Sequence, residues 1–293
     1  MPRFRYDTTG RWYKGNTHIH STCSDGGKTF AELAAMYAGK GFDFLFRTDH
    51  WVVSDVAADP ARYPLLWLDG VELDGADHGG SAYHVVCLGT LNGLTREKGV
   101  VAALESARAQ GAVLILAHPH WTGNTIEDAV RWRFDGVEVY NHVCRWINGR
   151  SDGAIHWSAM LERFPDTLGF AADDAHIRPE HPGWNGAWIM VNAPSCSRDA
   201  ILAAIRAGNF YSSCGPEIRS IENTGGRITV RTSPVAFVRL VSHAWRGCAV
   251  GSFDGRVMTE ATLDIPGDWP YACLEVEDAQ GRLAWTNALF LAR

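Results

Sequence analysis

Short apolar runs alternate with longer amphipathic segments from about residue 16 to residue 213. A helix is predicted at 29–40, because Thr29 and Glu32 form a capping-box pattern and Gly41 ends the segment. Further helices are predicted at 97–110, 125–132 and 198–207, the last with Ser197 as its cap. Apolar strands are predicted at 42–46, 112–116, 136–140 and 168–172. This alternation favours an α/β fold with a parallel sheet, either open or closed into a barrel.

The pattern changes after Gly215 and Pro216. Short β-rich runs separated by turn residues follow at 227–232, 236–241, 260–265, 272–277 and 289–292. This tail shows no convincing helix and therefore predicts a small antiparallel β-sandwich. The chain is accordingly expected to form two domains, an α/β domain at 1–215 and an all-β domain at 216–293.

The composition narrows the possible classes of function. The chain is 46% hydrophobic and 20% charged, which is typical of a folded protein with a large core. Its formal net charge of -6 gives no electrostatic reason to expect nucleic-acid binding. No stretch reaches the roughly 18–20 uncharged apolar residues that a membrane span requires, and the N-terminus lacks the apolar core of a secretory signal. The seven cysteines are scattered without a Cys-x-x-Cys pair, which indicates free thiols in a reducing compartment, so the cytoplasm is the expected location.

Histidine and carboxylate residues recur where the predicted strands end. His18 and His20 are two positions apart in an early extended segment, so both imidazoles point the same way. Comparable residues elsewhere are Asp49 with His50, Glu72 at the end of 68–72, His84 before 85–88, His118 with His120, Glu138 within 136–140, and Asp173 with Asp174 and His176. Parallel α/β folds build their sites at the carboxyl ends of strands. Histidine and carboxylate ligands without cysteine suit Zn²⁺, Mn²⁺ or iron, and this number of ligands indicates more than one ion and a water activated for hydrolysis.

Each of these residues also has an ordinary structural interpretation. An isolated His-x-His pair is more often surface or core histidine than a pair of ligands, and Glu72 or Glu138 could cap a helix or pair with an arginine. Asp173 and Asp174 could cap the following segment. The coincidence at several strand ends favours the metal site, because burying so many unpaired carboxylates would otherwise cost too much free energy. His120 is expected to be surplus, and Glu138 is expected to support the ligands or the fold.

Several motifs resemble those of the polymerase-and-histidinol-phosphatase (PHP) superfamily. These motifs are GNTHIHS at 15–21, SDG at 24–26, TDH at 48–50, LAHP at 116–119 and DAH at 174–176. The stretches GVEVYN at 136–141, DDAH at 173–176, RAGNFY at 206–211 and GPE at 215–217 are similar to one branch, which includes a carbaryl (carbamate) hydrolase and carries a C-terminal β domain. Arg47 and Ser158 depart from the family pattern, but neither is a predicted ligand.

The resemblance implies a distorted (β/α)7 PHP-type barrel that holds two or three divalent ions (Zn, Mn or Fe). One ion would be held by His18, His20, Glu72 and Asp174. Glu72 would bridge to a second ion held with His84 and His118, and a third would be held by Asp25, His50 and His176. His78 competes with His84 for its place, but the apolar strand that follows His84 favours His84.

These observations predict a metal-dependent hydrolase, with cleavage of a small, phosphorylated ester as the leading activity. Asp174, His176 and Arg178 are the expected catalytic residues, and Arg178, Arg145 and Arg47 are the expected substrate contacts, with Lys28 as a further candidate. Two alternatives stay open: hydrolysis of carbamates, amides or carboxylic esters, and a non-catalytic scaffold on which the β domain binds a partner. His120 and His142 are alternative general acids, and Trp51, Trp121, Trp146 and Trp184 are candidates for an aromatic pocket wall. The sequence leaves the oligomeric state open.

Overall fold

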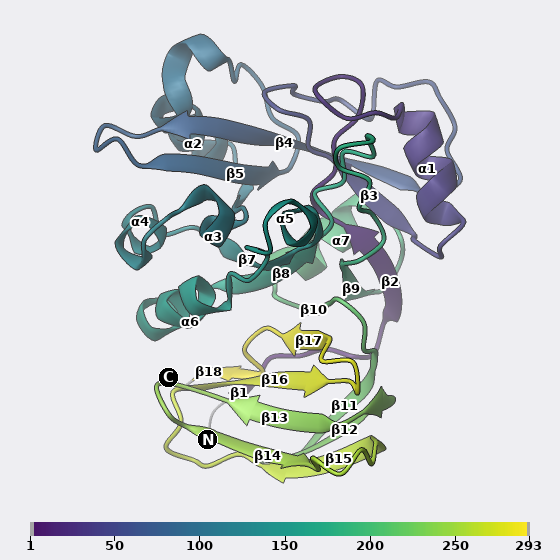
Figure 1. The fold of residues 1–293 in the computed structure, drawn as a ribbon, viewed down its shortest axis with the longest axis vertical. Coiled ribbons are helices and arrows are strands. Elements are labelled where there is room, and N and C mark those ends of the chain that lie inside the picture. Colours follow the sequence, from purple (N-terminus) through teal and green to yellow (C-terminus); the bar gives the residue numbers. More distant parts are fainter. Residues whose placement is uncertain (1–2, 292–293) are drawn as a thin grey trace.

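The computed structural model describes residues 3–291 of the chain. Its central feature is a path of neighbouring strands in the order β9-β2-β3-β4-β5-β6-β7-β8 (Figure 1). These strands are β2 (Arg11–Asn16), β3 (Phe44–Arg47), β4 (Leu66–Ala76), β5 (Ala82–Leu88), β6 (Val113–Leu116), β7 (Gly136–Asn141), β8 (Leu168–Ala172) and β9 (Trp188–Ala193). Strands β2, β3 and β4 are parallel to one another, as are β6, β7 and β8. The predicted α/β class with parallel strands is therefore confirmed.

The hairpin of β4 and β5 interrupts the predicted alternation of strand and helix. Strand β4 continues to Ala76, beyond the predicted end at Glu72, and β5 returns antiparallel to it. Strand β5 then pairs antiparallel with β6. Within residues 3–291 no ladder joins β8 to β2, although an isolated bridge between Ile19 and Ala175 links the segments that follow these strands. Closure into a (β/α)7 barrel stays a prediction.

Helices connect most of these strands. They are α1 (Phe30–Ala38), the 3-10 turn η1 (Arg96–Lys98), α2 (Gly99–Ala109), α3 (Pro119–Thr122), α4 (Ile126–Arg131), α5 (His142–Ile147), α6 (Ala154–Arg163) and α7 (Arg198–Arg206). The capping box of Thr29 and Glu32 is formed as predicted. Ser197 occupies the N-cap of α7, but its side chain makes no capping hydrogen bond, so the predicted capping role was wrong. The sequence did not predict α3, α5 or α6.

The strands after residue 215 are antiparallel and lie at the opposite end of the molecule from α1 and α2 (Figure 1). They are β11 (Ile218–Thr224), β12 (Arg227–Val235), β13 (Phe237–Val241), β14 (Gly247–Gly251), β15 (Met258–Asp264), β16 (Tyr271–Glu277), β17 (Leu283–Thr286) and β18 (Phe290–Leu291). Strand β17 pairs with β10 (Phe210–Ser213), and β18 pairs with β1 (Arg3–Phe4). The main sheet thus continues into the C-terminal part, and the predicted sandwich and the boundary at 215 remain predictions. Residue 292 of the last predicted run lies outside the described residues.

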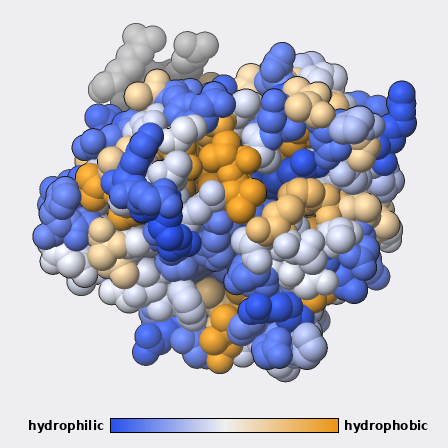
Figure 2. All heavy atoms as spheres, turned by 90° about the horizontal axis from the view of Figure 1, so that it is seen from above, coloured by the Kyte–Doolittle hydropathy of each residue, from blue (hydrophilic) through white to orange (hydrophobic). Residues whose placement is uncertain are grey.

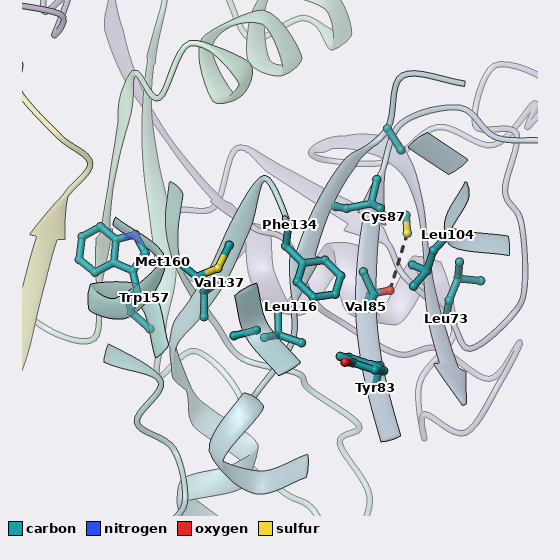
Figure 3. Packing of buried hydrophobic residues seen from close by; sticks show 14 of the residues in the cluster. Leu73, Tyr83, Val85, Cys87, Leu104, Leu116, Phe134, Val137, Trp157 and Met160 are labelled. Atoms are coloured by element: carbon teal, nitrogen blue, oxygen red, sulfur yellow. Dashed lines mark hydrogen bonds between the residues drawn. The ribbon is translucent and has the colours of Figure 1, made fainter. Parts of the chain in front are cut away.

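Apolar side chains of β4 to β7 pack against α2 and α6 (Figure 3). Leu104 of α2 and Leu73 of β4 are 2% and 0% exposed, and both belong to one continuous buried cluster. Trp157 and Met160 of α6 belong to the same cluster as Val137 of β7. Because this core fixes the strands, it also fixes the positions of the side chains that follow them.

Hydrophilic residues cover most of the face in Figure 2, where hydrophobic residues form small separate patches. All seven cysteines are free, which agrees with the predicted absence of disulfides. Among residues 3–291, no helix has both the length and the apolar character needed to cross a membrane.

Candidate metal centre

Four of the predicted ligands converge on one point in the interior. The Nε2 atoms of His18 and His20 are 3.1 Å apart, and the Oδ1 atom of Asp174 lies 3.0 Å from His20 Nε2. The Oε2 atom of Glu72 lies 3.1 Å from His18 Nε2 and 3.2 Å from His20 Nε2. Ligand atoms about 2.0–2.1 Å from one tetrahedral zinc ion would be about 3.3 Å from one another. The spacing of these atoms therefore fits ligands that surround a single ion.

The segments that follow β2 and β8 place these residues. The backbone N–H of His20 donates to Ala175 O, and the N–H of Asp174 donates to His18 O. Asp174 adopts φ of 53°, which lies in the sparsely populated left-handed region for a residue other than glycine. The two segments thus hold His18, His20 and Asp174 together although they are far apart in the sequence.

Glu72 connects this first group to a second group of imidazoles. Its Oε1 atom lies 2.9 Å from His84 Nδ1 and 3.5 Å from His118 Nε2. Its Oε2 atom lies 3.2 Å from His50 Nδ1. Glu72 is 1% exposed and sits between both groups, as expected of a bridging ligand. His78 is exposed and belongs to none of these groups, whereas His84 lies beside Glu72.

A third group contains Asp25 and His176. Their Oδ2 and Nε2 atoms are 3.2 Å apart, and Asp25 Oδ1 lies 3.5 Å from His20 Nδ1. The rings of His50 and His176 stack on that of His20, with centroids 4.6 and 4.3 Å away. All nine residues predicted as metal ligands therefore belong to one continuous cluster.

Unsatisfied polar atoms in the cluster show that its residues fit divalent cations. Glu72 Oε2, His20 Nδ1 and His50 Nδ1 are buried and make no hydrogen bond. Glu72 Oε2 and His20 Nδ1 face atoms of other predicted ligands, and His50 Nδ1 faces carboxylate oxygens of Glu72 and Asp74. An unsatisfied buried polar group costs about 1–3 kcal/mol. Because nitrogen and carboxylate oxygen are the ligands that zinc, manganese and iron accept, such ions would satisfy these atoms.

His20 and Asp174 stabilise each other's charged forms. Burial lowers the pKa of His20, but a hydrogen bond to Asp174 and the neighbouring Glu72 carboxylate outweigh it and raise this pKa to about 9. Burial raises the pKa of Asp174, but the imidazoles of His18 and His20 outweigh it and hold this pKa well below its ordinary value. A metal ion would compete with the protons on these imidazoles, so binding should release protons.

Glu138 is positioned to orient the ligands. His18 Nδ1–H donates to its Oε1 atom over 2.8 Å, which leaves Nε2 of His18 free to bind a metal. The Oε2 atom accepts from the backbone N–H of His118 at 2.9 Å and from Asn141 Nδ2 at 2.8 Å. Asn141 also donates to Asp174 Oδ2 over 3.3 Å. The sequence identified Glu138 as a supporting residue but gave no role to Asn141.

Replacing Glu138 by glutamine is expected to lower metal affinity or turnover by about 10–100-fold, because His18 would lose its charged partner. Metal affinity can be measured by titration with a competing chelator. Glu127→Gln, an exposed residue of α4, is the matched control. Unchanged affinity and turnover in Glu138→Gln would show that Glu138 does not position His18.

Asp74 is a neighbour of the cluster that the sequence analysis missed. Its Oδ1 atom lies 3.1 Å from His50 Nδ1, and both its oxygens accept from Arg96, at 2.8 and 2.9 Å. Residues two apart on a strand point the same way, so the spacing of Glu72 and Asp74 on β4 was the signal that could have found it.

A cavity of about 180 Å³ opens onto the cluster. Seven of the nine predicted ligands line it, together with Trp121, Val143, Ile147, Arg178 and His181. Arg178 is therefore at the cluster, as predicted. Its Nε atom is buried and has no hydrogen-bond partner within the described residues.

Two of the predicted substrate contacts lie elsewhere. Arg47 is buried, forms an ion pair with Asp59 and stacks over the ring of Phe30, 4.0 Å from its centroid. Arg145 lines a different cavity. We therefore correct both assignments: the guanidinium of Arg47 is already paired, and that of Arg145 lies on the other face of α5.

Other candidates have structural roles or lie on the surface. Asp49 accepts from Ser21 and Ser24, and Asp173 accepts from three backbone N–H groups and the Tyr37 hydroxyl. Lys28 lies 3.7 Å from Glu32, and His120 is exposed outside the metal-binding groups. Of the four tryptophans considered, Trp121 lines the cavity.

No protein-family model matches the chain, and none of the curated proteins does. Among solved structures, the chain is similar to a two-domain protein from Bacteroides vulgatus that contains a predicted PHP-like metal-dependent phosphoesterase, with 17% identity, 98% of both chains covered and a TM-score of 0.56. An amidohydrolase from Chromobacterium violaceum, with bound sulfate and no metal, is 23% identical over 58% of this chain and 57% of that one, with a TM-score of 0.24. The second likeness is too weak to support any inference. The first confirms the predicted resemblance at the level of fold: nearly the whole chain shares the fold of this two-domain protein, which contains a predicted PHP-like part.

Proposed function

We propose that the chain is a metal-dependent hydrolase that cleaves small phosphate esters. The observation that carries this proposal is Glu72 Oε2, a buried carboxylate oxygen that makes no hydrogen bond and lies within 3.2 Å of nitrogen atoms of His18, His20 and His50. Two or three divalent ions held by the nine clustered residues would polarise the ester and lower the pKa of a water molecule.

The protein's own side chains would bind and orient the substrate. Arg178 lines the cavity beside His176, so its guanidinium can donate to the non-bridging oxygens of a phosphate group. His181 faces His176 with ring centroids 5.7 Å apart and adds a further donor. Trp121, Val143 and Ile147 also line the cavity, so their apolar surfaces would exclude water and contact the organic part of the ester.

Hydrolysis of carbamates, amides or carboxylic esters is the second candidate. It is favoured by the same apolar wall and by the presence of one arginine, Arg178, in the cavity lining. A neutral ester or carbamate needs less positive charge than a phosphate dianion does. The extent to which turnover depends on Arg178 therefore distinguishes phosphate-ester hydrolysis from hydrolysis of carbamates, amides or carboxylic esters.

Arg178→Ala is expected to lower kcat/KM for p-nitrophenyl phosphate by about 10–100-fold, equivalent to roughly 1.4–2.7 kcal/mol of lost transition-state stabilisation. The same variant should change turnover of a neutral p-nitrophenyl carbamate by less than about threefold, since that substrate has no dianion to pair. Arg150→Ala, an exposed arginine outside the cavity, is the matched control.

Both substrates should be assayed on wild type and variants loaded with manganese, zinc or iron. Chelator-sensitive phosphate-ester turnover with the expected loss in Arg178→Ala supports the proposal. Turnover of the carbamate alone would favour the second candidate. Turnover of neither substrate by fully metal-loaded protein would contradict both.

A further inference from the structure

A second cavity, of about 380 Å³, lies across α5 from the metal centre. His142 and Arg145 line this cavity, whereas Val143 and Ile147 line the metal-centre cavity. At about 100° per helical residue, these two pairs project from opposite sides of α5. The volume falls within the range of about 300–1,000 Å³ that is typical of small-molecule sites.

The lining of this second cavity carries positive charge. Lys14, Lys40, Arg145 and Arg282 are among its lining residues, and no aspartate or glutamate is. Arg282 pairs with Asp278 at 2.7 Å, whereas no described carboxylate lies within 4.0 Å of the charged groups of the other three. Three unpaired cations therefore surround a space that holds no acidic partner.

Lys14 is fixed in place without a strong hydrogen-bond acceptor. Its Nζ atom lies over the rings of Phe42 and Trp188, 4.0 and 4.1 Å from their centroids. Its polar contacts, with Lys40 O and Asn185 Oδ1, are both 3.5 Å long, at the limit for a hydrogen bond. An ammonium group has three donors, so Lys14 can still donate to a ligand.

The segment of Asn185 and Gly186, beside Lys14, is already ordered. The buried Asp173 carboxylate accepts from the backbone N–H groups of Asn185 and Gly186, both at 2.8 Å. A Cβ atom on Gly186 would lie 2.1 Å from the His142 ring, so only glycine allows this close packing. Ligand binding would therefore require little ordering of this loop.

We infer that this cavity binds a small organic phosphate or inorganic phosphate, at a site separate from the metal centre. A phosphate dianion supplies acceptors for Lys14 and Arg145 together, and such charge-assisted hydrogen bonds are stronger than neutral ones. The volume leaves room for an organic group beside the phosphate. The inference is independent of the proposed hydrolase activity, because none of these cations lines the metal-centre cavity.

Equilibrium dialysis of the metal-loaded full chain against ³²P-labelled inorganic phosphate at pH 8 tests the inference. Wild type should bind two equivalents at saturation, one in each cavity. The double variant Lys14→Met and Arg145→Met should lose one equivalent, while its turnover of p-nitrophenyl phosphate stays within about twofold of wild type. Asp174→Asn, which alters the metal centre, should keep the equivalent that the double variant loses.

The double variant Arg62→Met and Arg150→Met is the control, because it removes the same charge from exposed positions outside both cavities. Arg145→Met alone should lower the affinity of the second cavity for phosphate. Because Arg145 is exposed, this single variant is expected to fold, so it tests the site even if the variant that includes Lys14→Met misfolds. Equal phosphate binding by wild type and the Lys14→Met/Arg145→Met variant would overturn the inference. Loss of all phosphate binding in Asp174→Asn would also overturn it. Wild type could also bind a single equivalent of phosphate that only the Lys14→Met/Arg145→Met variant loses. This result would support binding in the second cavity and would give no support to phosphate binding at the metal centre.

Discussion

Replacing Asp174 by asparagine is expected to lower phosphate-ester turnover by at least about 1,000-fold, equivalent to roughly 4 kcal/mol of transition-state stabilisation. The Asp174 carboxylate lies 3.0 Å from His20 Nε2 and 3.2 Å from His18 Nε2. Asparagine has the same shape but no negative charge, so the group that would hold an ion loses its anionic ligand. Turnover and metal content, measured on the same sample, should fall together.

The fold of the Asp174→Asn variant should persist, because its backbone bond to His18 O does not depend on the carboxylate. Far-UV circular dichroism checks this expectation. Asp268→Asn, at an exposed position, is the matched control and should behave like wild type. An Asp174→Asn variant with full metal content and wild-type turnover would show that the cluster is not the active site.

Replacing Glu72 by glutamine is expected to remove at least two bound ions and to reduce turnover by a similar factor of about 1,000 or more. The two oxygens of Glu72 lie within 3.5 Å of nitrogen atoms in five imidazoles, those of His18, His20, His50, His84 and His118. One substitution therefore affects two of the groups that could hold an ion. Elemental analysis of the variant measures this effect directly.

Glu105→Gln, an exposed residue of α2, provides the control for Glu72→Gln. The two predictions differ in the number of ions: Asp174→Asn alters mainly the first group, whereas Glu72→Gln alters the first and the second. Retention of wild-type metal content by Glu72→Gln would contradict its proposed bridging position.

The residues of the cluster could be picked out from the sequence because short-range patterns carry them. His18 and His20 are two apart in an extended segment, and Asp174 and His176 directly follow the apolar run of β8. Each pattern is local, so the sequence alone can reveal it. Their convergence could be expected because the ends of parallel strands meet at one edge of a sheet.

The directions of other side chains near the motifs could not be predicted, because they depend on how the surrounding elements begin, end and pack. Arg47 immediately precedes the TDH motif, yet its side chain is buried in an ion pair with Asp59. Arg145 lies in α5, which begins at His142, and it lines the second cavity. The direction of its side chain depends on where this helix begins, and the sequence did not predict the helix. Asp74 was missed because β4 extends beyond Glu72 into a hairpin.

In the C-terminal part, too, local patterns predicted elements but not the contacts between distant elements. Its short β-rich runs were visible between turn residues, and the structure has strands at four of those positions. Pairing of β17 with β10 joins segments about seventy residues apart, and no local pattern specifies such a pairing. The predicted separation into two domains depends on this kind of long-range contact.

Elemental analysis of the purified full chain tests the central claim most directly. The predicted result is two to three equivalents of zinc, manganese or iron per chain, lost on dialysis against a chelator and restored on reloading. A protein that neither holds such ions when purified nor binds them on reloading would contradict the assignment of the histidine and carboxylate cluster as a metal centre.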